Sequence, residues 1–253
     1  MSRLVIFLYG LGAYGVFFAT FLYALGFVGN VVVPKGLDSP PTAPLTTALL
    51  INIALLALFA IQHSVMARPW FKRTLLRFIP AAAERSTYVL ASSVALILLF
   101  WQWSPIGGVV WNIQNPVGRI VAFAVFASGW LLVMVTTFLI NHFDLFGLRQ
   151  VWLHLRGKEY TQLNFVTPLP YRLVRHPLYL GWLLAFWATP TMTATHLLFA
   201  LVTTGYILLA IQFEERDLIS IHPEYEDYRN RVPMILPLGT RPAAAGVERV
   251  SAA

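Results

Sequence analysis

The stretch "YRLVRHPLYLGWLLAFW", residues 171–187, joins a polar segment to an apolar one. Two arginines and a histidine precede Pro177, and almost every residue after it is apolar. Proline is favoured in the first turn of a helix, because that position needs no N–H donor. The stretch therefore predicts charged and aromatic groups at the point where an apolar helix begins.

The composition of the whole chain agrees with a membrane helix at this point. Of 253 residues, 58% are hydrophobic and 11% are charged, whereas soluble domains carry about 25% charged residues. A membrane-spanning helix needs about 20 mostly apolar residues. The apolar blocks are residues 4–28, 45–67, 88–103, 117–140 and 178–213. The third is slightly short for a span.

The last block is too long for one span and is interrupted by "ATPTMTATH". A tight helical hairpin with Pro190 at its tip fits this pattern. We therefore predict an all-α, polytopic integral membrane helical bundle with about five spans. Residues 1–240 are expected to form a single membrane-embedded domain, and residues 241–253 a disordered tail.

The charges are divided between the two ends of the predicted bundle. The formal net charge is +7, and all but Lys35 and Arg119 of the 18 Lys and Arg residues lie in the two termini and two basic loops. The positive-inside rule places these segments in the cytoplasm and loops 29–44 and 104–116 outside. Basic residues near anionic headgroups explain the net charge without nucleic-acid binding. The absence of cysteine excludes disulfides and thiolate metal sites.

Most histidines fall in the predicted cytoplasmic half of the chain. They are His63, His142, His154, His176 and His222. Ionisable groups at membrane depth are costly and usually functional, so this distribution indicates one site at the cytoplasmic face. A structural interpretation is also open, in which the arginines before Pro177 are membrane anchors and the nearby aromatic residues form an interfacial belt.

The last third of the chain carries a more specific pattern. "YRLVRHPLYLG" is followed by "EERDL" and then by "HPEYEDYRNRVPMILP". This arrangement resembles the signature of the isoprenylcysteine carboxyl methyltransferase superfamily, integral-membrane enzymes that use S-adenosylmethionine. The matching residues are Arg175, His176, Pro177, Tyr179, Gly181, Glu214, Glu215, Leu218, Tyr225, Tyr228 and Pro233.

Three further segments resemble the bacterial methanethiol S-methyltransferases of this superfamily. They are "QHSVMARPWFKR" at 62–73, "ERSTYVLASS" at 84–93 and "NHFDLFGLRQVW" at 141–152. The resemblance implies methylation of methanethiol to dimethyl sulfide, with hydrogen sulfide as a further acceptor. It also implies an active site on the cytoplasmic side of a bacterial cytoplasmic membrane. No metal and no covalent enzyme intermediate is required.

The resemblance places S-adenosylmethionine in the C-terminal part, about residues 168–237. Arg172 or Arg175 would meet its carboxylate, and Glu214 or Glu215 its amino group or ribose. The full expected donor-binding set is Tyr171, Arg172, Arg175, His176, Pro177, Tyr179, Gly181, Glu214, Glu215, Leu218, Tyr225 and Tyr228.

The acceptor side is expected near the end of the fourth apolar block. A thiolate is the nucleophile in thiol methylation, so a base near the sulfur would help. His142, oriented by Asp144, is the predicted catalytic pair, with a bend near Gly147. In the structural alternative, the same two residues cap the helix and bind Arg149. His63 and Tyr88 are expected to line the substrate cavity.

Three other functions share some of these features. One is methylation of a prenylcysteine carboxylate or another lipid-like acceptor. Another is a sterol reductase, whose fold is distantly related, although no dinucleotide-binding glycine pattern is present. The third is a small-molecule transporter that uses the intramembrane His and Asp residues as a proton relay. The sequence does not define an oligomeric state.

Overall fold

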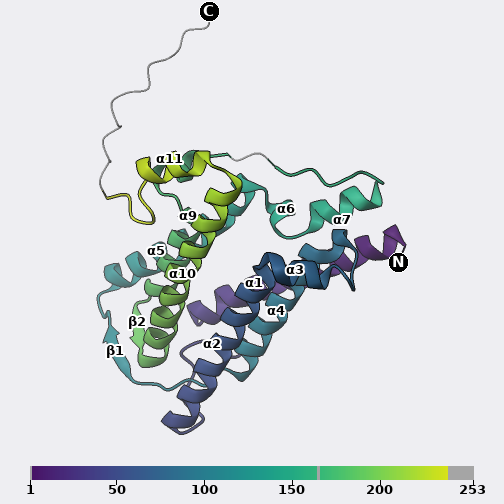
Figure 1. Cartoon of the computed structure of the whole chain (residues 1–253). Coiled ribbons are helices and arrows are strands. Elements are labelled where there is room, and N and C mark those ends of the chain that lie inside the picture. The colour runs from purple at the N-terminus through teal and green to yellow at the C-terminus, as the bar shows by residue number, and fades with distance from the viewer. Residues whose placement is uncertain (1, 164–165, 239–253) are drawn as a thin grey trace, which may run out of the picture.

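The computed structural model of the chain describes residues 2–163 and 166–238 (Figure 1). The predicted disordered tail, residues 241–253, lies outside the described residues. The elements in chain order are α1 (Arg3–Gly29), α2 (Leu45–Ala67), α3 (Pro69–Leu75), η1 (Ala81–Ala83), α4 (Glu84–Gln102), β1 (Val109–Asn112), α5 (Pro116–Ile140), α6 (His142–Leu145), α7 (Leu148–Leu155), α8 (Leu169–Leu173), α9 (Pro177–Trp187), β2 (Thr191–Thr193), α10 (Ala194–Ile221) and α11 (Glu224–Arg231).

Five helical segments are long and apolar enough to cross a membrane. They are α1, α2, Ala81–Gln102, α5 and α10. Large apolar side chains such as Leu4, Leu8 and Leu11 are about half exposed along α1, as expected for a surface that faces lipid rather than water. The predicted all-α membrane bundle is therefore confirmed. The third span is not short, because the helix begins before residue 88, at Ala81.

The last apolar block is a hairpin of two unequal helices. α9 has 11 residues and α10 has 28. At 1.5 Å per residue, α9 rises only about 16 Å, about half of a ~30 Å hydrocarbon core. The tip is not a tight turn, because β2 pairs antiparallel with β1 and the carbonyl of Pro190 accepts a hydrogen bond from Ile113 N (2.8 Å). The sequence analysis did not predict this strand pair.

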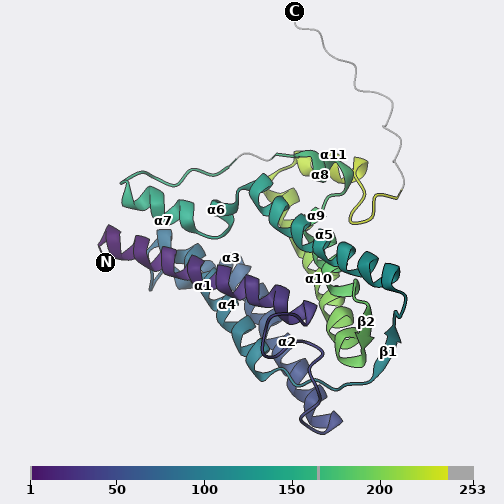
Figure 2. The ribbon, with the colours of Figure 1, turned by 180° about the vertical axis from the view of Figure 1, so that it is seen from behind.

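The six apolar helices form two groups, which Figures 1 and 2 show from opposite sides. One group contains α1, α2 and α4, and the other contains α5, α9 and α10. The strands lie at one end of the bundle, and α6, α7, α8 and α11 lie at the other. We call these the strand end and the basic end.

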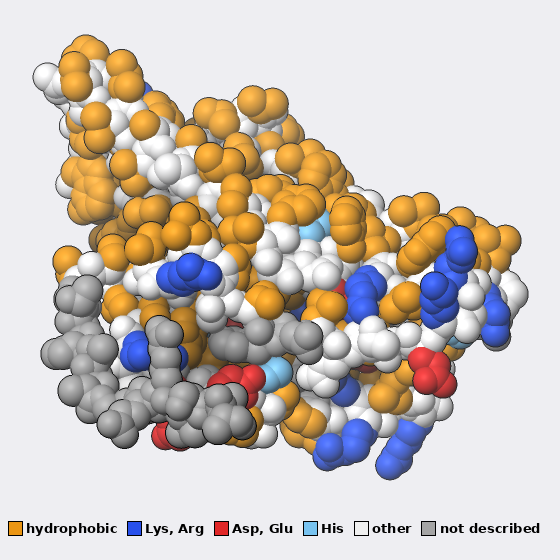
Figure 3. Space-filling view, turned by 90° about the horizontal axis from the view of Figure 1, so that it is seen from above, with side chains coloured by type: hydrophobic (Ala, Val, Ile, Leu, Met, Phe, Trp, Pro, Cys, Tyr) orange, Lys and Arg blue, Asp and Glu red, His pale blue; other side chains and the backbone are white. Residues whose placement is uncertain are grey.

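The charges follow this division. The basic end carries many Lys and Arg side chains, and Figure 3 looks onto it. Lys35 and Arg119 lie at the strand end, where they donate hydrogen bonds to the carbonyls of Trp101 (2.8 Å) and Ile113 (3.5 Å). The strand end also contains a buried pair, in which Asp38 Oδ2 lies 2.9 Å from His196 Nδ1. The charge separation expected from the sequence is therefore present in space.

Helices α5 and α9 approach each other closely through glycine. A Cβ atom added at Gly129 would lie 2.7 Å from the backbone of Gly181 and of Ala185, and one at Gly181 would lie 2.8 Å from the carbonyl of Gly129. Small residues at such a crossing let helix backbones pack directly in membranes. This contact fixes the short helix α9 against a full-length span.

We expect Gly129→Ala to destabilise the protein by about 1–3 kcal/mol, because the added methyl group meets backbone that has no room to move. Thermal unfolding in detergent would measure the change. Gly205→Ala on α10 is the matched control, since a Cβ atom there meets nothing within 4 Å. Equal unfolding temperatures for the two variants would contradict direct backbone packing at Gly129.

Candidate active site

The C-terminal motifs converge on the carboxylate of Glu215. Arg175 Nε donates to its Oε1 at 2.8 Å, and His176 Nε2 donates to the same oxygen at 3.0 Å. Arg229 Nε lies 3.3 Å from the other oxygen. Glu215 is 3% exposed and His176 5% exposed. A buried carboxylate is stable only when it is paired and hydrogen-bonded, and these contacts meet that requirement.

Backbone contacts hold this cluster in place. The N–H groups of Arg175 and His176 donate to the carbonyls of Pro233 (2.8 Å) and Met234 (3.1 Å). Arg175 Nη1 donates to the carbonyls of Arg229 (2.9 Å) and Val232 (2.6 Å). The guanidinium of Arg175 is thus engaged by the protein itself. These contacts make Arg175 part of the support of the cluster.

Other residues of the expected donor-binding set lie beside this cluster, and one of them, Tyr171, has a hydroxyl group without a partner among the described residues. Tyr179 donates to Glu214 Oε2 at 2.9 Å. Tyr228 donates to the carbonyl of Tyr171, whose own hydroxyl is buried and has no hydrogen-bond partner among the described residues. Arg172 is exposed and donates to the carbonyl of Thr167 (3.2 Å).

Three of the tyrosines at the basic end remain protonated. Burial raises the pKa of Tyr171 and of Tyr225, and it raises the pKa of Tyr228 to about 12. Their hydroxyl groups therefore act as hydrogen-bond donors at physiological pH. Tyr225 lies 3.5 Å from Glu215 Oε1, so it adds a further donor to the buried carboxylate.

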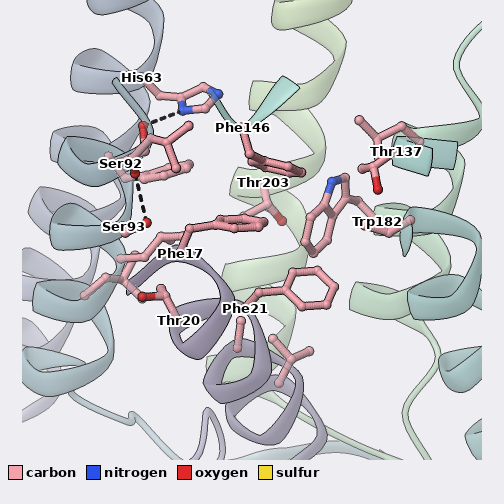
Figure 4. A pocket seen from close by; sticks show the side chains of 18 of the residues that line it. Phe17, Thr20, Phe21, His63, Ser92, Ser93, Thr137, Phe146, Trp182 and Thr203 are labelled. Carbon is pink, nitrogen blue, oxygen red and sulfur yellow. Dashed lines mark hydrogen bonds between the residues drawn. The ribbon is translucent and has the colours of Figure 1, made fainter. Parts of the chain in front are cut away.

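An apolar cavity of about 350 Å³ lies between the two helix groups. Its walls come from α1, α2, α4, α5, α6, α9 and α10, and most of its lining side chains are aromatic or aliphatic. Figure 4 shows Phe17, Phe21, Phe146 and Trp182 around the space, with a few hydroxyl groups between them. Such a lining suits a small apolar ligand and excludes water.

His63 and Tyr88 line this cavity, as the sequence analysis expects. The Tyr88 hydroxyl and His63 Nε2 are 2.8 Å apart, and His63 Nδ1 lies 3.1 Å from Ser92 Oγ. Figure 4 shows His63 and Ser92 joined on one side of the space. These hydrogen bonds join His63 on α2 to Tyr88 and Ser92 on α4, and they hold the His63–Tyr88 pair in position.

His142 also lines the cavity, at the junction of α5 and α6. Burial lowers the pKa of His142, so the ring is neutral near pH 7. The Thr137 hydroxyl donates to the carbonyl of Met134 (2.7 Å) and therefore accepts from His142 Nδ1–H (2.9 Å). Nε2 then carries the lone pair and accepts from the Tyr14 hydroxyl at 2.8 Å.

The expected pairing of His142 with Asp144 is not formed. Asp144 binds Arg149 at 2.9 Å and accepts from Tyr160 at 3.2 Å, while Asn141 caps α6. Two residues in sequence separate His142 from Asp144 by about 200° on a helix, and the turn after α6 does not bring them back together. The structural alternative for Asp144, an ion pair with Arg149, is the observed arrangement.

Three other residues of the expected S-adenosylmethionine-binding set are apolar. Gly181 lies in the α5–α9 contact and does not line the cavity, because close helix packing needs its missing side chain. Pro177 occupies the first turn of α9, as expected. Leu218 is partly buried, one turn after Glu214 on α10.

Tyr179 connects the two halves of the site. Its ring lines the apolar cavity, while its hydroxyl binds Glu214 beside the buried cluster. The sequence analysis missed Thr137 and Arg85, which line the cavity, and Tyr14, which forms a hydrogen bond with the lining residue His142. No local pattern marks these residues, because helices far apart in sequence bring them together. Among the described residues, no group of three or more His, Asp or Glu side chains is arranged to hold a metal ion.

The chain is similar to several methanethiol S-methyltransferases. The chain is 59% identical to a methanethiol S-methyltransferase of Crocosphaera subtropica, over 94% of this chain and 93% of the relative. It is 55% identical to that of Mycobacterium tuberculosis, over 94% and 98% of the two chains. It is 56% identical to methanethiol S-methyltransferase 2 of Bradyrhizobium diazoefficiens, over 93% and 91%.

No protein-family model and no solved structure matches the chain. The relatives nevertheless span nearly all of both sequences, so both helix groups and the buried Glu215 cluster fall within the shared region. On this identity and coverage, the protein is a methyltransferase and belongs to the methanethiol S-methyltransferase family.

Proposed function

We propose that this protein transfers a methyl group from S-adenosylmethionine to methanethiol and releases dimethyl sulfide, with hydrogen sulfide as a further acceptor. The observation that carries the proposal is the position of Tyr179, which joins a polar cluster at the basic end to an apolar cavity. The names of the relatives support methanethiol as the acceptor.

The polar groups beside the cavity suit S-adenosylmethionine. The buried hydroxyl of Tyr171 lacks a partner among the described residues, and such groups in native proteins usually meet a ligand or water. Tyr171, Glu214 and Leu218 would hold the donor, and the contacts of Glu215 with Arg175 and His176 would support them. When bound, the donor supplies an electrophilic methyl group, whose bond to sulfur breaks with the electron pair leaving on that sulfur.

The residues around the cavity would prepare the acceptor. Apolar walls exclude water and bring the acceptor sulfur close to the donor site. The neutral ring of His142 would take the thiol proton at Nε2 once the bound acceptor displaces the Tyr14 hydroxyl that donates to this nitrogen, and Thr137 fixes the tautomer. Asp144 holds the turn between α6 and α7 through Arg149 and is not part of this step.

The charge separation supports a location in the bacterial cytoplasmic membrane with both termini and the basic end in the cytoplasm. S-adenosylmethionine is water-soluble and charged, so its site should open to that side. The acceptor is small and apolar, and it can reach the cavity from the bilayer or from the cytosol.

The first experiment is a headspace assay of purified protein in detergent with S-adenosylmethionine and methanethiol. We expect dimethyl sulfide from the wild type and a loss of at least about a hundredfold in Glu215→Gln, because breaking a buried ion pair costs several kcal/mol. Donor binding without product would indicate a larger, lipid-like acceptor. The absence of both dimethyl sulfide and S-adenosylmethionine binding would overturn the proposed function.

Tyr171→Phe should weaken S-adenosylmethionine binding by about tenfold, which matches one lost hydrogen bond. The unfolding temperature without ligand should not change, because the hydroxyl has no partner among the described residues to lose. Calorimetric titration measures the first effect and thermal unfolding the second. Tyr23→Phe at the strand end is the control, since its hydroxyl donates only to the carbonyl of Lys35. Unchanged donor affinity in Tyr171→Phe would remove Tyr171 from the donor site.

The acid limb of the rate profile tests His142. A base must be neutral, and burial lowers the pKa of His142, so kcat should stay level as the pH falls to about 6.5, the ordinary histidine value, and drop only below it. Tyr14→Phe removes a hydrogen bond that favours the neutral ring, so the midpoint should move upward. An acid limb that is identical in wild type and His142→Gln would rule out His142 as the base.

A further inference from the structure

A second cavity adjoins the apolar one at the basic end. This polar cleft has a volume of about 630 Å³ and shares Arg85 and Leu145 with the apolar cavity. The two spaces therefore meet at these residues. The other charged and titratable groups that line the cleft are Lys72, Glu84, Asp144, His154, Lys158, Glu159 and Tyr160.

Arg85 is positioned rigidly at this junction. Its Nε donates to the carbonyl of Leu145 at 2.7 Å, and its guanidinium carbon lies 5.1 Å from the centre of the Tyr88 ring. These contacts fix the plane of the group from two sides and leave its two terminal amino groups available. A planar guanidinium held in this way is well suited to bind an anion.

The charge of Arg85 is not neutralised by the described part of the protein. Within residues 2–163 and 166–238, its two Nη groups have no hydrogen-bond partner, and no carboxylate lies within ion-pair distance. Asp144, which also lines the cleft, is bound to Arg149. Of the side chains that line the apolar cavity, Arg85 is the one with a permanent charge.

A thiolate acceptor in the apolar cavity would be stabilised by a cation where the cavity meets the polar cleft. An anionic sulfur in an apolar cavity loses its hydration, which raises the pKa of a thiol and opposes ionisation. An opposite charge nearby reverses this effect. We propose that Arg85 binds the acceptor sulfur as its anion, thiolate or hydrosulfide, through the two Nη groups where the cavity meets the polar cleft. This inference rests on the proposed function and adds the residue that selects the ionised acceptor.

The test measures the bound acceptor without turnover. Methanethiol is titrated into wild type, Arg85→Gln, Arg85→Lys and Arg77→Gln, and the ultraviolet absorbance of the thiolate is followed from pH 6 to about pH 10. Arg77 is exposed and lines neither cavity, so its variant controls for one lost positive charge. Thermal unfolding reports whether each variant is folded, and calorimetry reports S-adenosylmethionine affinity.

We expect the midpoint of thiolate formation to be higher in Arg85→Gln than in wild type by about 1–2 pH units, a 10- to 100-fold smaller thiolate fraction. Arg85→Lys should raise the midpoint by a smaller amount, because the charge stays but the two Nη groups are lost. Arg77→Gln should stay near wild type, and donor affinity should not change in any of the variants. If Arg85→Gln does not fold, a raised midpoint in the folded Arg85→Lys would support the proposal, because the ammonium lacks the two Nη groups, and a wild-type midpoint would overturn it.

Two results would overturn the role of Arg85 while leaving the proposed function in place. A wild-type midpoint in folded Arg85→Gln would overturn the proposed anion contact. A tenfold loss of donor affinity with an unchanged midpoint would overturn it too, and would assign Arg85 to the donor carboxylate. In both cases the wild type still makes dimethyl sulfide, whereas failure of the proposed function is the absence of that product in the wild type.

Discussion

The pairing of Glu215 with Arg175 and His176 is the constraint on which the basic end depends. A carboxylate that is 3% exposed must be compensated, and its partners come from two separate parts of the chain, the entrance to α9 and helix α11. The segment around Pro233 holds the first of these parts through backbone hydrogen bonds. With Arg175 and His176 held in this way, Tyr179 and Glu214 form a hydrogen bond beside the Glu215 cluster, and the Tyr179 ring lines the apolar cavity. Arg175 and His176 of the family motif are thus engaged with Glu215, while the buried Tyr171 hydroxyl beside them has no partner among the described residues.

The short helix α9 determines where the two halves of the site meet. It begins at the buried cluster and ends about halfway across an average bilayer, and β2 with its partner β1 completes the path to the far end. Gly129 and Gly181 hold it against α5, which leaves room between the helix groups for the apolar cavity. A full-length helix with larger residues at that crossing would move Tyr179 away from the polar cluster. The glycine contact is therefore a packing requirement that also sets the geometry of the site.

Hydrophobic block length and the proline and glycine pattern predicted the spans well, because lipid imposes a long and uniform constraint on each helix. The convergence of Arg175, His176 and Glu215 followed from the motif, although its detailed contacts did not. The strand pair was missed, because its backbone bonds join residues about 80 apart and carry no local pattern. Asp144 was misplaced for a related reason: Arg149, five residues later, competes for the same carboxylate, and sequence spacing alone does not show which partner wins. Tyr14 next to His142 is a contact between the first span and α6, which follows the fourth span, and only the fold defines it.

An apolar cavity presents a conflict for any enzyme that needs an anionic nucleophile. The walls that exclude water also make a bare thiolate costly, by several kcal/mol for an uncompensated charge. A carboxylate-supported base would add a second negative charge to the same space, and Asp144 is instead neutralised by Arg149. A neutral histidine at one point of the lining and an uncompensated arginine at another avoid that repulsion. In the proposed reaction, removal of the proton by His142 is thus separate from stabilisation of the anion by Arg85, and no carboxylate in the lining opposes the negative charge on the sulfur.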